Sequence, residues 1–123
     1  FLAEYRIKDM KTRDYFDHID PSGKCIGSYA TNFNLSYTES SFSEAQLKYP
    51  SPTTFDVKKA VDYWMGSRGH KYTLMDYGQI SGALACDNQY CIFIAHGREG
   101  WRCNSAKEGY QYWDTVEKQA GET

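Results

Sequence analysis

Apolar residues recur at helical spacing in two parts of the chain. Over residues 2–15 they stand three or four positions apart, among charged residues that suit a solvated face. A second periodic segment begins after Thr53 or Thr54, either of which suits a helix cap, and its apolar face includes Trp64. These patterns predict two amphipathic helices. The second helix places Trp64 in the core, and the polar turn beyond it leaves Arg68 in solvent.

Two short apolar runs, 79–86 and 91–97, flank the tetrapeptide DNQY. Both runs are apolar on both faces, which predicts central antiparallel strands covered on each side. The polar and aromatic segment 29–43 predicts a loop over a cleft, and 43–48 predicts a short helix that ends at YPSP. The mixed tail after residue 103 predicts a last helical stretch. Helices before and after a covered hairpin indicate an α+β fold in α-β-α layers.

Composition limits the classes of protein to consider. The 123 residues fit a single domain spanning 1–123. The net charge is -2 and Lys and Arg are scattered among Asp and Glu, so no basic stripe marks a nucleic-acid partner. The apolar runs are far shorter than the roughly 20 residues that a membrane-spanning helix needs. We expect a monomer without a transmembrane segment, and a core rich in large aromatic side chains.

The cysteines indicate an oxidising compartment. Cys25, Cys86, Cys91 and Cys103 lack the C-x-x-C spacing of structural zinc sites, which favours disulfides over metal binding. Cys86 and Cys91 face each other across the predicted hairpin, which leaves Cys25 with Cys103. The other two pairings, and four reduced thiols, stay open. The glycosylation triplet at Asn34 also suits export. We expect a secreted or cell-surface protein in a mature form.

Several motifs occur together in one order. They are DMKTRDYFDHIDPSG, YTES and AVDYWMGSRGHKYTLM, followed by a strand pair that contains glycine. Over residues 3–97 this order resembles the short prokaryotic members of the CAP superfamily, which is named after cysteine-rich secretory proteins, antigen 5 and class-one pathogenesis-related proteins. The resemblance implies a three-layer α-β-α sandwich with a mainly antiparallel sheet. It leaves residues 98–123 as a C-terminal extension.

The resemblance also implies a site. Family members hold two histidines and two acidic residues around a central cleft, and these positions fall on His18, Glu39 and His70, with Ser67 in place of the fourth. Arg6 stands where many prokaryotic members have another histidine. Such a cleft implies a small ligand, lipid-like or sterol-like, or a weakly bound divalent cation such as Zn²⁺ held by His18, Glu39 and His70. No cofactor is required.

Each candidate also has a structural interpretation. His70 suits a helix-end histidine bonded to a carbonyl, and His18 suits a residue that fixes the turn at Pro21. A hydrolase that uses Ser67 and His70 lacks a third group to orient the base. A structural or adhesion module needs no cleft chemistry at all. We therefore predict a binding domain rather than an enzyme, with metal binding lost as the histidines protonate below about pH 6.5.

Overall fold

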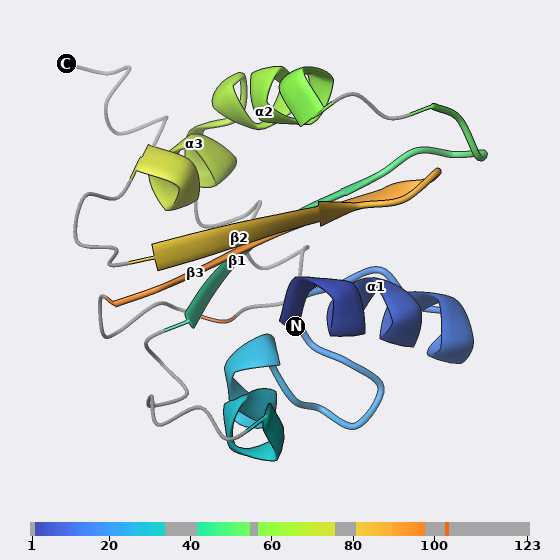
Figure 1. The fold of residues 1–123 in the computed structure, drawn as a ribbon, viewed down its shortest axis with the longest axis vertical. Helices are drawn as coiled ribbons and strands as arrows, with labels where there is room; N and C mark the ends of the chain where they lie inside the picture. Colours follow the sequence, from blue (N-terminus) through green and yellow to red (C-terminus); the bar gives the residue numbers. More distant parts are fainter. Residues whose placement is uncertain (1, 34–41, 55–56, 76–80, 98–102, 104–123) are drawn as a thin grey trace, which may run out of the picture.

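The computed structural model describes residues 2–33, 42–54, 57–75, 81–97 and 103, and Figure 1 shows helices around a three-stranded antiparallel sheet. In chain order the elements are helix α1 (Leu2–Arg13), the 3-10 helix η1 (Ile26–Phe33), strand β1 (Phe42–Lys48), helices α2 (Val57–Met65) and α3 (Arg68–Met75), and strands β2 (Ser81–Cys86) and β3 (Tyr90–His96). The predicted α+β class is confirmed. The positions of Asn34, Glu39 and the tail 104–123 lie outside the described residues.

The strand order in the sheet is β1-β3-β2, with both pairings antiparallel. The register of β1 on β3 runs from Phe42 opposite His96 to Lys48 opposite Tyr90. The prediction that both strands of the β2–β3 hairpin are central and covered is therefore wrong for β2. This strand lies at one side of the described sheet, and Ser81–Ala83 at its start are exposed. Small side chains at this end lose little by facing water.

Residues 43–48, for which the sequence predicts a short helix, form most of strand β1 instead. The prediction is wrong because Glu, Ala, Gln and Leu are all good helix formers, and pairing along β3 overrides that local preference. Successive side chains of a strand point to opposite faces. Ala45 and Leu47 join an apolar cluster with α2, whereas Glu44 and Gln46 bond to α1 and the segment after it. β1 therefore carries polar side chains into the protein on one face.

The buried apolar side chains form two clusters that share β3. The first contains Leu2, Ala3, Ile7, Met10, Ile26, Tyr29, Phe42, Tyr90, Ile92 and Ile94. The second contains Ala45, Leu47, Ala60, Trp64 and Cys91, with Phe93 packed against it. The alternation along β3 sends neighbouring residues to opposite clusters. Figure 1 agrees: α1 lies on one side of the sheet, and α2 and α3 lie on the other.

The two predicted helices are confirmed, with shorter bounds. α1 ends at Arg13, where Asp14 takes the left-handed conformation at φ 53° and the amide of Tyr15 donates to the carbonyl of Met10 at 3.2 Å. Trp64 of α2 is fully buried, as predicted, and its Nε1 donates to the carbonyl of Gln46 at 3.1 Å. The predicted exposure of the Arg68 side chain lies outside what the structure describes.

Helix α2 ends at Met65, and the chain continues into a second short helix almost at once. It bends at Gly66 and Ser67, and α3 begins at once, with the Lys71 amide donating to the Ser67 carbonyl at 2.8 Å. His70 therefore lies inside a second short helix rather than just beyond the end of the first.

Both favoured cysteine pairs are bonded in the structure, and no cysteine is free. Cys86 and Cys91 close the β2–β3 hairpin as direct partners in the register, with Cα atoms 4.2 Å apart. The other bond joins Cys25, just before η1, to Cys103, 78 positions later. Two disulfides are consistent with a secreted protein. Among the described helices none is long and apolar enough to cross a membrane.

Candidate functional site

A buried ion pair links α1 to β1. Arg6 stands on the buried stripe of α1, and Glu44 points toward it from the facing side of β1. The Nε and Nη2 atoms of Arg6 donate to the two carboxylate oxygens of Glu44 at 2.7 and 3.0 Å, and both side chains are 0% exposed. This two-pronged arrangement is the strongest that an arginine and a carboxylate form. It satisfies two charges that are costly to bury singly.

The electrostatics of Glu44 follow from these contacts. Burial by itself raises the pKa of the Glu44 carboxyl, but the charge of Arg6 and the hydrogen bonds from His18 and Arg6 lower it below its ordinary value. Burial likewise opposes the charge on Arg6, whose pKa is nevertheless raised overall by Glu44 and Tyr15. Glu44 is therefore an ionised carboxylate at neutral pH.

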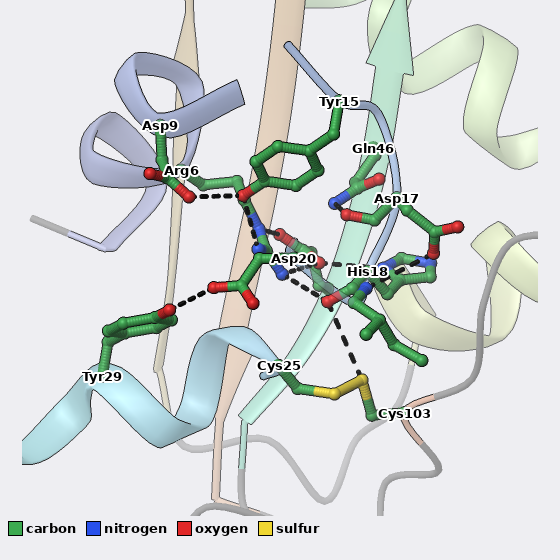
Figure 2. Close-up of polar contacts among 12 residues, drawn as sticks. Arg6, Asp9, Tyr15, Asp17, His18, Asp20, Cys25, Tyr29, Gln46 and Cys103 are labelled. Atoms are coloured by element: carbon green, nitrogen blue, oxygen red, sulfur yellow. Dashed lines mark hydrogen bonds and ion pairs between the residues drawn. A yellow bond between two sulfur atoms is a disulfide. The ribbon is translucent and has the colours of Figure 1, made fainter. Parts of the chain in front are cut away.

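His18 is held through both its ring and its main chain. Its Nδ1 lies 2.8 Å from Oε1 of Glu44, and its carbonyl accepts a hydrogen bond from Nη2 of Arg6 at 2.7 Å. The preceding carbonyl, of Asp17, accepts from the side chain of Gln46 at 2.8 Å. Figure 2 shows these contacts converging on the segment that follows α1. A loop histidine is thereby tied to a helix and a strand.

A chain of hydrogen bonds extends from Arg6 away from His18. The Tyr15 hydroxyl accepts from Nη1 of Arg6 at 3.0 Å and donates to Asp9 at 2.7 Å. Burial and the bond to Asp9 raise the pKa of Tyr15. Arg13 then bridges Asp9 and Asp20, at 2.7 and 2.8 Å. This network braces the segment between α1 and η1.

Asp20 fixes the turn at Pro21, a role that the sequence also allows for His18. One oxygen of Asp20 accepts from the amides of Ser22 and Lys24, both at 2.9 Å, and the other accepts from the Tyr29 hydroxyl. Burial and this contact with Asp20 raise the pKa of Tyr29 to about 12. These contacts of Asp20 hold the turn, and Nδ1 of the His18 ring is engaged by Glu44 (Figure 2).

His70 is the second histidine of the site. Its Nδ1 is buried, and it has no hydrogen-bond partner in the part of the chain that the structure describes. The ring lies 6.1 Å from that of Tyr63, centroid to centroid. Burial, followed by the charge of His18, lowers the pKa of His70 to about 4. The His70 ring therefore stays neutral to a lower pH than its ordinary pKa of about 6.5 would give.

The structure places three of the four predicted site residues. His18 and His70 come from separate segments, and the charge of His18 contributes to the lowered pKa of His70. Glu39 lies outside the described residues, and the carboxylate that bonds to His18 is Glu44, which the sequence interpretation missed. Ser67 contributes main-chain hydrogen bonds at the junction of α2 and α3.

One signal in the sequence marks Glu44. Between residues 44 and 48 polar and apolar side chains alternate, which is the strand pattern, and an acidic residue in such a strand needs a partner if it is buried. The assignment of this segment to a helix hid that pattern.

The site offers two imidazoles rather than a complete set of metal ligands. Among the described residues no group of three His, Cys, Asp or Glu side chains is arranged to hold a metal ion. The third histidine, His96, lies elsewhere, with its ring edge-on to Phe42 and its Nε2 3.4 Å from the Ser81 hydroxyl. Comparison with protein-family models, curated proteins and solved structures finds no match to this chain.

Proposed function

We propose that this protein is a secreted or cell-surface binding domain of the CAP type, with the three-layer arrangement of that family. Its site at His18 and His70 takes a small ligand, and a divalent metal ion such as Zn²⁺, bound weakly, is the ligand that the geometry supports best. The observation that carries this proposal is the buried Nδ1 of His70, which lacks a hydrogen-bond partner among the described residues and belongs to a ring whose pKa is affected by the charge of His18.

An unsatisfied buried polar atom is costly to a folded protein, by about 1–3 kcal/mol. Such an atom persists where a ligand completes it or where function requires it. The lowered pKa keeps the His70 ring neutral at physiological pH, and a neutral imidazole has one nitrogen with a free lone pair. His70 is thus chemically prepared to accept a metal ion or a hydrogen-bond donor.

The surroundings of His18 support a metal ion in particular. Histidines that bind metals commonly donate their other ring N–H to a carboxylate, and Glu44 stands in that position behind His18. Both oxygens of Glu44 are engaged by Arg6 and His18, so Glu44 acts as the supporting partner rather than as a ligand. Structural and catalytic zinc sites use three or four protein ligands, so two imidazoles give weak binding.

Other functions remain predictions from the sequence alone. A lipid-like ligand and an adhesion role have no observation in their favour among the described contacts. A serine hydrolase needs a hydroxyl that meets a base, and the hydrogen bonds described for Ser67 are made by its main chain. We therefore favour a binding domain over an enzyme.

The proposal is tested by calorimetric titration of Zn²⁺ into the wild type and into His18→Ala and His70→Ala variants. Each variant removes one of the two protein ligands. Loss of a residue that only supports a ligand already weakens metal binding about tenfold or more, so each variant is expected to bind Zn²⁺ more than about tenfold more weakly than the wild type. His96→Ala is the matched control and should bind as the wild type does. Equal affinity in all four proteins would show that the histidines are structural.

A further inference from the structure

The contacts of Arg6 say more about the site than its charge alone. We infer that Arg6 is a positioning residue: together with Glu44 it clamps His18 in the tautomer that carries its proton on Nδ1, and so leaves the lone pair on Nε2. The inference rests on the proposed function, in which a ring nitrogen of His18 meets the ligand. Arg6 itself touches no ligand.

The identity of the donor follows from the partners of Glu44. An ionised carboxylate accepts hydrogen bonds and donates none. Oε2 of Glu44 accepts from Nε of Arg6, and Oε1 accepts from Nη2. The short contact between Oε1 and Nδ1 of His18, at 2.8 Å, is therefore a bond in which Nδ1 donates. In the neutral ring the remaining nitrogen, Nε2, then has no proton.

The geometry is a closed clamp rather than a single contact. Nη2 of Arg6 donates at once to Oε1 of Glu44 and to the carbonyl of His18, at 3.0 and 2.7 Å. Oε1 of Glu44 in turn accepts from the ring of His18. The backbone and the ring of one residue are thus fixed by the same ion pair, which is wholly buried. Rotation of the ring would break the bond to Glu44 while Arg6 still held the backbone.

The guanidinium group is needed for this clamp. Arginine presents five N–H donors in a rigid plane, and Arg6 uses three of its nitrogens on Glu44, His18 and Tyr15. Lysine keeps the positive charge but concentrates it on one nitrogen with flexible donors, so it cannot hold the carboxylate and the carbonyl in the same geometry. Replacement of Arg6 by lysine therefore keeps the positive charge and removes only the positioning of His18.

The test uses the fact that the chain has three histidines, so their ring signals can be assigned individually. Long-range ¹H–¹⁵N correlation spectra of the metal-free protein, recorded where the rings are neutral, report which nitrogen carries each proton. In the wild type we expect the proton of the neutral His18 ring to be on Nδ1 and not on Nε2. In Arg6→Lys both nitrogens should move toward the averaged shifts of exchanging tautomers. The same variant should bind Zn²⁺ about tenfold or more weakly.

Tyr15→Phe is the matched control, because it removes the hydroxyl that accepts from Nη1 of Arg6 and leaves the clamp intact. It should keep the wild-type tautomer and should not show the roughly tenfold loss of Zn²⁺ affinity expected of Arg6→Lys, because the contact that it removes lies outside the clamp. A proton on Nε2 of His18 in the wild type would overturn the inference, and that result does not depend on whether Arg6→Lys folds. Unchanged spectra and affinity in a folded Arg6→Lys protein would overturn it as well. If the tautomer is as expected but the wild type binds no Zn²⁺, the proposed function fails and the clamp stands.

Discussion

At the scale of single residues, the charge of a buried group depends on whether an oppositely charged group contacts it. Glu44 is fully buried and yet ionised, because a guanidinium group contacts both of its oxygens. His70 is also largely enclosed, but among the described residues no acidic group offsets the cost of charging it. Burial therefore has opposite outcomes for the two residues: one stays charged and the other stays neutral.

The lowered pKa of His70 predicts how stability depends on pH. In the unfolded chain the ring titrates at about 6.5, whereas in the folded protein it titrates at about 4, so the unfolded state binds more protons between these values. The free energy of unfolding should fall as pH drops from about 6.5 to 4.5, by about 2 kcal/mol from this group. Below that range the lowered pKa of Glu44 adds a further loss.

Urea unfolding of the wild type and of His70→Gln at several pH values measures this contribution. Glutamine does not titrate, so the variant should lose less stability than the wild type between about pH 6.5 and 4.5. The difference between the two curves isolates His70 from every other titrating group. Curves that run parallel over this range would mean that the ring is accessible to protons in the folded state.

At the scale of elements, the sequence predicts the parts whose pattern and local preference agree. α1 and α2 have both an apolar stripe and helix-forming residues, and both are helices. β1 has helix-forming residues on a strand pattern, and pairing with β3 decides the outcome. The error at β1 also concealed Glu44, so the missing part of the site and the missing strand have one cause. The choice of His18 and His70, in contrast, rests on the family resemblance and stays a prediction.

The packing of α2 on the sheet depends on Trp64, which is fully buried in the second apolar cluster. Trp64→Ala should lower the free energy of unfolding by about 3–5 kcal/mol, since it empties a large volume and strands the carbonyl of Gln46. Val57→Ala, on the same helix at 53% exposure, should change it by about 0.5 kcal/mol or less. Chemical denaturation measures both values. If Trp64→Ala loses as little stability as Val57→Ala, the helix face assigned to the core is wrong.

At the scale of the whole molecule, the disulfides tie together segments that are far apart in sequence. The Cys25–Cys103 bond holds Cys103 beside the His18 segment, where Sγ of Cys103 lies 3.9 Å from the His18 carbonyl (Figure 2). The sequence favours this pairing by elimination, because Cys86 and Cys91 are predicted to pair across the hairpin. It predicts the α+β class from the order of elements, but it cannot give the strand order, which depends on contacts between distant segments.

The two disulfides should differ in their contribution to stability. On the chain-entropy model, the link across 78 positions is worth roughly 4 kcal/mol and the hairpin link across 5 positions about 2 kcal/mol. Replacing Cys25 and Cys103 together by alanine should therefore cost more than replacing Cys86 and Cys91 together. Unfolding of both double variants tests the order, after peptide mapping without reduction has verified the pairs. The reverse order, or free thiols in the native protein, would contradict this account.

The central claim is that His18 and His70 meet one ligand, and Zn²⁺ titration followed by NMR of the three histidine rings tests it most directly. The signals of His18 and His70 should shift together, with one apparent affinity, while those of His96 stay in place. This pattern requires both rings to be at the same site, whatever the strength of binding. Shifts of His96 to the same extent, or shifts of His18 and His70 with different affinities, would contradict the claim.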